Sequence, residues 1–285
     1  MKPLKNIHLQ QSIHISSISV GSTSIKTESL RSLRELGPKA DNESDIDVRA
    51  AAAMCQYAYY ALNNGQKPKA ELIDGWKPMK SYEVDKLVEP NFHLKLKRDA
   101  SGFNSMLFQK YADGIQYYAY CTEGTDMTSV KDWFSNISQG LIGLSPQYSY
   151  SVQMAMDLDR AIGDKAVLWF IGHSLGGGLA SNNSLVTSRH AITFNAAGLN
   201  SLRVGATLLL NNQAELFHFD RRRKRIHAFV LEGEILNSIL RWIGQEAYGT
   251  KHVITYQYKQ GEKMKSSVEK HGLTTILDSW GMKHD

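Results

Sequence analysis

The sequence predicts an α/β fold, with a mostly parallel central sheet and helices on both of its faces. The first observation is a continuous apolar run, residues 166–171 (AVLWFI), which has the length and composition of a strand buried on both faces. The second is that strand-like runs alternate with helix-like patterns, which is typical of parallel sheets with right-handed crossovers. The third is length, because 285 residues can form one large domain with a well-buried core.

The chain changes character near residue 45. Residues 1–45 are rich in Ser, Lys and Asn and show no sustained period, which predicts a poorly ordered N-terminal arm or a docking segment. Residues 46–285 carry the periodic segments and contain no internal repeat. We therefore expect one folded domain over residues 46–285.

Capping and turn residues delimit the elements before the apolar run. Asp45 or Asp47 can cap an alanine-rich helix, and Gly163 ends an amphipathic pattern of helical length. A turn at 112–114 separates two strand-like runs. The expected elements are, in chain order, a helix at 45–62, strands at 102–109 and 114–122, and helices at 129–136 and 145–162.

The elements after the apolar run are shorter. Residues 199–225 are the least regular stretch and end in a basic run, 221–225. We expect this run either to meet anionic headgroups at a membrane surface or to form a solvated loop. The expected elements are a helix to about residue 189, strands at 191–196, 225–232 and 251–259, and a final helix at 268–280.

Composition excludes several classes of protein. Lys plus Arg exceed Asp plus Glu by five (33 − 28), a mild excess that lacks the interleaved aromatic and basic residues of a nucleic-acid surface. No window approaches the roughly 18 apolar residues of a membrane span. The N-terminus lacks a secretory apolar region, so we expect synthesis in the cytoplasm without a signal peptide. Cys55 and Cys121 have no C-x-x-C partner and are expected to be buried thiols, and no metal site is predicted.

The apolar run leads directly into a catalytic motif. Gly172-His173-Ser174-Leu175-Gly176 fits G-x-S-x-G, the strand-to-helix turn that presents a nucleophilic serine. Gly172 and Gly176 are required because a Cβ on either side of so sharp a turn would collide with the backbone. The alternative is a glycine-rich turn with an idle serine. The preceding apolar run and the small residues that follow favour a catalytic Ser174, and His173 is expected to be packed or supporting.

A nucleophilic serine needs a base to accept its proton. In α/β-hydrolases the chain order is serine, acid, histidine, with the histidine after the last strand. This order leaves His271 and His284 as candidates. We favour His271, because His284 lies one residue from the C-terminus, where order is hard to maintain.

The base needs a carboxylate to orient it. Glu232 and Glu234 both follow the strand expected at 225–232, and we favour Glu234 because it lies beyond the Gly233 turn and can reach over the sheet edge. Glu232 is the alternative acid, while Asp220 and Asp278 are weaker candidates.

The developing oxyanion needs two donors. The backbone N–H of Leu175 is one by its position after the nucleophile. The second is expected from the turn at Gly124-Thr125, where Thr125 offers both an N–H and a hydroxyl.

Taken together, these motifs resemble the class 3 (fungal-type) lipase superfamily of α/β-hydrolases. The similarity lies in the GHSLGGGLA elbow, the upstream Glu123-Gly124-Thr125 turn and the Asp132-Trp133 pair, with Glu123 in place of the family's arginine. The segments TFNAAGL, GEIL and KHGLTTIL are similar to bacterial lipase-like toxins, including phospholipase effectors of type VI secretion systems. The resemblance covers roughly residues 46–281.

The resemblance implies a serine esterase that cleaves acyl esters of phospholipids, with no metal and no organic cofactor. It implies a lid over about residues 126–144 and peripheral contact with a membrane surface. It also implies delivery into a target cell by a specialised secretion system and an immunity protein in the producing cell. Two alternatives remain: an esterase of neutral lipids or small esters without a membrane role, and an interaction module that keeps the fold but has lost its chemistry.

Overall fold

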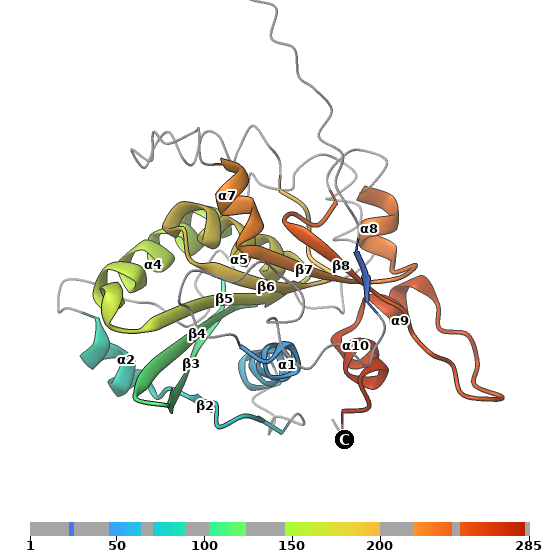
Figure 1. Cartoon of the computed structure of the whole chain (residues 1–285), viewed down its shortest axis with the longest axis horizontal. Coiled ribbons are helices and arrows are strands. Elements are labelled where there is room, and N and C mark those ends of the chain that lie inside the picture. The colour runs from blue at the N-terminus through green and yellow to red at the C-terminus, as the bar shows by residue number, and fades with distance from the viewer. Residues whose placement is uncertain are drawn as a thin grey trace, which may run out of the picture.

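A single sheet forms the centre of the computed structural model, which describes residues 23–25, 46–63, 71–88, 103–123, 146–199, 219–240 and 246–282 (Figure 1). The strand order is β1-β8-β7-β6-β5-β4-β3-β2. Strands β4 to β8 run parallel, as does β1 on β8, while β3 and β2 add antiparallel pairs at the other edge. The strands are β1 Thr23–Ile25, β2 Lys77–Pro78, β3 Ser105–Ala112, β4 Ile115–Thr122, β5 Val167–His173, β6 His190–Phe194, β7 Ile226–Leu231 and β8 Thr250–Ile254.

Helices cover both faces of this sheet, which confirms the predicted fold class. Helices α4, α5 and α7 lie on one face, and α1 and α10 lie on the other (Figure 1). The parallel strands β4 to β8 follow one another in space as they do in sequence, so successive right-handed crossovers place their helices on the same face. The helices are α1 Val48–Asn63, α2 Ser81–Leu87, α4 Pro146–Ile162, the 3₁₀ turn η4 Gly163–Lys165, α5 Leu175–Thr187, α7 Phe219–Lys224, α8 Ile235–Leu240, α9 Ser267–His271 and α10 Leu273–Ser279.

The apolar run of β5 separates two cores. Its side chains alternate, so Trp169 and Ile171 pack with α1 and α10 on one face, while Leu168 and Phe170 pack with α4 and α5 on the other. All four side chains are buried. This is the reason the strand reads as continuously apolar in the sequence.

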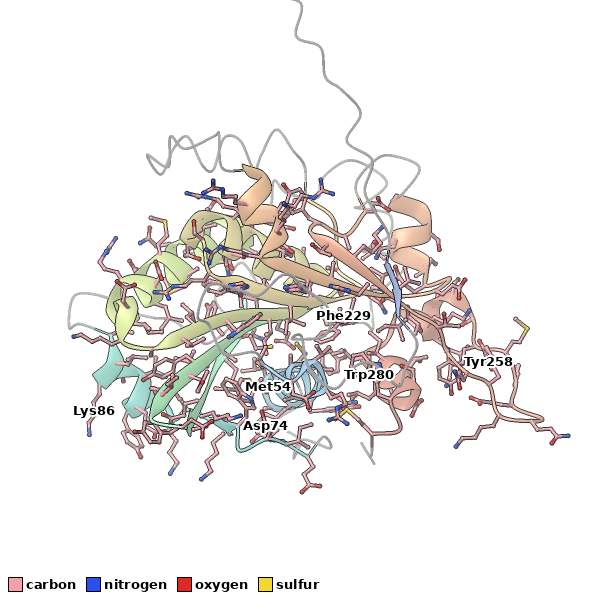
Figure 2. All side chains as sticks on the ribbon, viewed as in Figure 1. Met54, Asp74, Lys86, Phe229, Tyr258 and Trp280 are labelled. Carbon is pink, nitrogen blue, oxygen red and sulfur yellow. The ribbon has the colours of Figure 1, made fainter. Side chains whose placement is uncertain are left out.

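The core under α1 and α10 also brings distant residues together. Met54 of α1, Phe229 of β7 and Trp280 at the end of α10 lie around it (Figure 2), and the Phe229 and Trp280 ring centroids are 6.4 Å apart. The same core holds Cys55 and Cys121 as buried free thiols, with their Sγ atoms 3.8 Å apart.

Turn residues behave as the sequence predicts at the β3–β4 hairpin. Asp113 and Gly114 have φ angles of 51° and 79°, the two left-handed residues of a tight hairpin turn.

Within residues 1–45, the structure describes β1, which pairs with β8. The prediction of a poorly ordered arm otherwise lies outside the described residues, as do the helix expected at 129–136 and the lid expected at 126–144.

Three predicted elements were wrong in their extent. The strand expected at 102–109 is displaced to β3 at Ser105–Ala112. The strand expected at 251–259 ends at Ile254, and the chain then leaves the sheet even though its alternating pattern continues. The helix expected at 268–280 is divided at Gly272, whose ψ of 142° is extended rather than helical. In the described part of the chain no helix is long and apolar enough to cross a membrane.

Candidate active site

Ser174 occupies a strained turn between β5 and α5. Its φ and ψ are 58° and −127°, a region that residues other than glycine rarely adopt. A Cβ on Gly172 would lie 2.3 Å from the Gly176 carbonyl oxygen, and a Cβ on Gly176 would lie 2.2 Å from that of Thr122. Both contacts are with backbone atoms that cannot move aside, so only glycine fits at either position. The Thr122 hydroxyl also donates a hydrogen bond to the Gly176 carbonyl at 2.7 Å, which ties the turn to the end of β4.

The structure brings Ser174, His271 and Glu234 together in one hydrogen-bonded chain. His271 Nε2 lies 3.0 Å from Ser174 Oγ, and His271 Nδ1 lies 2.7 Å from Glu234 Oε2. The three residues are 5%, 0% and 1% exposed. Ser174 follows β5, Glu234 follows β7 and His271 ends α9, so elements far apart in sequence converge at the carboxyl ends of the parallel strands.

Glu234 is held by more than the histidine. Its Oε1 accepts hydrogen bonds from the Asn237 backbone N–H at 2.5 Å and the Asn237 side-chain amide at 2.7 Å, and its Oε2 accepts one from the Leu236 N–H at 2.9 Å. These N–H groups begin α8, so the carboxylate caps that helix and also faces His271. Its geometry is therefore fixed independently of the histidine.

The other sequence-predicted acids lie elsewhere. Glu232 is exposed, and its Oε2 lies 3.2 Å from the Thr255 hydroxyl rather than near His271. Asp278 pairs with Lys265 at 3.6 Å. The side chain of Asp220 and the whole of His284 lie outside the described residues. Of the four acids considered, the structure places Glu234 against the imidazole.

The division of the last helix positions His271. The carbonyl groups at the end of α9 lack partners within that helix. The His271 carbonyl instead accepts hydrogen bonds from His173 Nε2 at 2.8 Å and from the Asn195 side-chain amide at 2.9 Å, and the Lys270 carbonyl accepts from the same amide at 3.0 Å. These bonds hold the backbone of the histidine against β5 and β6.

Asn195 and Asn237 are supporting residues that the sequence analysis did not identify. Asn195 has a φ of 41° and accepts a hydrogen bond from the Leu231 N–H through its Oδ1, so it links β6, β7 and α9. Asn237 also accepts from the Ala247 N–H. The available signal for Asn195 was an asparagine directly after a buried strand, at the edge where a parallel sheet builds its site.

His173 supports the site as an uncharged group. Burial, and then the charge of the nearby His271, lower the pKa of His173 to about 3. A neutral imidazole has one N–H, and the contact with the His271 carbonyl assigns it to Nε2. The expectation that His173 is packed or supporting agrees with this position.

One expected oxyanion donor is described. Leu175 is the first residue of α5, so its N–H has no partner four residues earlier in the helix. Gly124 and Thr125, expected to supply the second donor, lie outside the described residues, which end at Glu123 in this part of the chain. Among the residues that the structure describes, no group of three or more His, Cys, Asp or Glu side chains is placed to hold a metal ion.

Comparisons with known proteins agree with this architecture. The Tle-like phospholipase domain matches residues 50–277, most of the chain. A stretch of 99 residues, 35% of the chain, is 44% identical to a protein of Serratia liquefaciens named extracellular phospholipase A1. That stretch covers 28% of the relative, so the match spans less than a third of the relative's length. The extent of the domain match shows that the chain belongs to the Tle-like phospholipase family.

Proposed function

We propose that the chain is a serine esterase that hydrolyses acyl esters of phospholipids, as a phospholipase A. The observation that carries the proposal is the unbroken chain of contacts from Ser174 Oγ through the His271 ring to Glu234, at 3.0 and 2.7 Å. A serine hydroxyl needs a base and an oriented tautomer to act as a nucleophile, and this arrangement supplies both.

In the proposed reaction, Ser174 Oγ attacks the ester carbonyl while His271 Nε2 accepts its proton. Glu234 holds the Nδ1–H and stabilises the imidazolium, and the Leu175 N–H donates to the oxyanion. The C–O bond to the lysophospholipid breaks, and the leaving oxygen takes the proton from His271. Water, deprotonated by His271, then attacks the acyl-enzyme and releases the fatty acid, which restores the Ser174 hydroxyl.

Two findings support a phospholipid as substrate. The family matched over residues 50–277 is one of phospholipases, and the bacterial relative is named a phospholipase A1. The relative's name also supports the sn-1 ester as the bond that is cleaved. The alternative is an esterase of neutral lipids or small soluble esters, which shares the same catalytic residues and differs in the substrate that it accepts.

The test compares the wild-type protein with Ser174→Ala. Vesicles of phosphatidylcholine and phosphatidylglycerol are incubated with each, and their lipids are analysed by mass spectrometry. We expect lysophospholipid and fatty acid from the wild type and at least about a 10⁴-fold lower rate from the variant. Product from p-nitrophenyl butyrate but none from vesicles would favour the small-ester alternative. Unchanged hydrolysis in Ser174→Ala would contradict Ser174 as the nucleophile, and no hydrolysis of either substrate by the wild type would favour the interaction module.

We also propose that the chain acts as an antibacterial effector, delivered into the periplasm of a target cell and neutralised by an immunity protein in the producer. Support comes from the similarity to lipase-like effectors and from the relative's description as extracellular. Wild type directed to the periplasm of a susceptible bacterium should arrest growth, whereas Ser174→Ala should not. Equal growth with the two proteins would contradict the effector role without bearing on the esterase.

A further inference from the structure

The segment between β8 and α9, residues 255–266, forms a projecting arm at one end of the molecule (Figure 1). Tyr258 lies on this arm, away from the body of the sheet (Figure 2). We call residues 255–266 the β8–α9 arm. Its first five residues, 255–259, belong to the strand expected from the sequence, but they lie outside β8, which ends at Ile254.

The arm is held in one shape by its own hydrogen bonds. Glu262 accepts from the Lys259 N–H at 2.9 Å and from the Tyr256 hydroxyl at 2.6 Å, while the Glu262 N–H donates to the Lys259 carbonyl at 3.0 Å. The Tyr258 hydroxyl accepts from the Lys265 N–H at 3.2 Å. Gly261 completes the turn with a φ of 80°, a conformation that favours glycine. The tip is therefore presented in a defined geometry.

This tip exposes an apolar side chain among cationic ones. Met264 is 75% exposed, the highest value among the exposed large apolar side chains of the described residues. Lys259 and Lys263 are also exposed. The arm contains three lysines and one glutamate, a net charge of +2 (3 − 1). An exposed apolar residue next to lysines is the pattern of a surface that enters the headgroup region of a bilayer.

The arm also lies beside the catalytic residues. It begins at the carboxyl end of β8, the edge of the sheet at which Ser174 and Glu234 are placed, and it ends at Ser266, which caps the helix that carries His271. Val268 of that helix is a further exposed apolar side chain, at 41%. Contact of the arm with a lipid surface would bring the active-site edge of the sheet to that surface.

The basic run at 221–225 lies at the other end of the parallel strands, the end at which they begin. It directly precedes Ile226, the first residue of β7, so a whole strand separates it from Glu234. Arg222 is buried and donates to the Leu185 carbonyl at 2.7 Å, and Arg223 stacks over the Tyr248 ring at 5.4 Å. These two cations are engaged in the fold, whereas Arg221 and Lys224 are exposed, and the run lies at the end of β7 away from Glu234.

We propose that the β8–α9 arm docks the protein on an anionic phospholipid bilayer, with Met264 inserted and Lys259 and Lys263 against the headgroups. The proposal rests on the proposed phospholipase function, because it assigns that site its substrate surface. Anionic lipid is the occupant that the lysines favour, since each cation near such a surface strengthens binding.

Binding is tested in the Ser174→Ala background, so that the vesicles stay intact during sedimentation. The probes are vesicles of equimolar phosphatidylcholine and phosphatidylglycerol, and of phosphatidylcholine alone, at about 0.15 M salt. Lys259→Glu with Lys263→Glu should weaken binding to the anionic vesicles at least about 25-fold, from about fivefold for each lysine. Met264→Ser should weaken binding about tenfold, as expected for a buried apolar side chain.

Matched control residues lie at the amino ends of the parallel strands, away from the active site. Lys165 and Lys224 are exposed lysines just before β5 and β7, and their double change to Glu should leave binding within about twofold. Tyr111 is 72% exposed beside the β3–β4 turn, and its change to Ser is the control for Met264→Ser. With the Ser174 hydroxyl present, the arm variants should cleave p-nitrophenyl butyrate at the wild-type rate and melt at the wild-type temperature.

The outcomes separate the arm from the esterase. Equal loss of binding in the arm and control variants, or none in either, would overturn the docking proposal even if phospholipid is cleaved. Arm-dependent binding without phospholipid cleavage by the wild type would support the docking and contradict the phospholipase. Binding of the arm to a protein of the producing cell but not to either vesicle would overturn the lipid proposal.

Discussion

Replacing Glu234 by Gln tests the candidate site most directly, because the change preserves shape and removes charge. The carboxylate accepts four hydrogen bonds, two at each oxygen. A glutamine has one oxygen and one NH₂ group, so it can accept at only one of these two positions. Either orientation leaves two donors facing the amide nitrogen.

The two orientations fail in different ways. If the NH₂ group faces His271, the ring must accept at Nδ1 and carry its proton on Nε2, where it can no longer accept the proton of Ser174. If the NH₂ group faces Asn237, two N–H donors lose their partner, which costs about 1–3 kcal/mol of stability for each buried group. In both cases the imidazolium loses its counter-charge.

We expect kcat to fall about 10³–10⁴-fold in Glu234→Gln, which is about 4–5.5 kcal/mol of transition-state stabilisation. The assay is hydrolysis of p-nitrophenyl butyrate, with a thermal melt to show that the variant is folded. Glu232→Gln is the matched control, since Glu232 is exposed and its carboxylate accepts a hydrogen bond from the Thr255 hydroxyl rather than facing His271. It should keep kcat within about twofold.

The reasoning would be refuted by a folded Glu234→Gln protein that retains more than about a tenth of the wild-type kcat. Equal and small losses in both glutamine variants would show that neither glutamate orients the base. Glu234→Asp offers an independent check, because shortening the side chain withdraws the carboxylate from the 2.7 Å contact with His271 while keeping its charge.

Three further predictions follow from the supports around the site. Asn195→Ala removes three hydrogen bonds to the β7 and α9 backbones, so kcat should fall about 100-fold with KM for the soluble ester unchanged, and a parallel fall in KM would contradict a purely positioning role. Gly176→Ala should cost more than about 2 kcal/mol, since its Cβ would meet the Thr122 carbonyl; an unchanged melting temperature would show that the turn is looser than described. Burial lowers the pKa of His227 to about 3 and of His252 to about 4 from 6.5, so the unfolded chain binds more protons below pH 6.5. Stability should therefore be fully present above pH 6.5 and fall towards pH 4, by about 2 kcal/mol for each histidine at about pH 5, and a urea midpoint that rises on acidification would disprove this.

Local signals in the sequence were sufficient for the fold class and for the position of the serine turn. The apolar strand at 166–171, the glycines around Ser174 and the Asp113-Gly114 turn each specify a backbone conformation over a few residues. Chain order then restricted the base to two histidines and the acid mainly to two glutamates. The predicted boundaries of elements were less accurate where the alternating pattern continued but the strand ended, as beyond Ile254.

Long-range contacts decided the remainder. The break at Gly272 depends on Asn195 and His173, which offer hydrogen bonds to the end of α9 from two other strands. The choice of Glu234 depends on its capping of α8, which turns the carboxylate inward, while Glu232 turns towards Thr255.

The sequence by itself determined that a serine stands on a sharp strand-to-helix turn in an α/β domain, because glycine requirements and apolar periodicity act between neighbouring residues. Only the tertiary structure decided which imidazole and which carboxylate reach that serine, and that residues 255–266 leave the sheet beside them. The physical reason is that those contacts join residues 37 and 97 positions apart, and the packing of the whole sheet sets such distances.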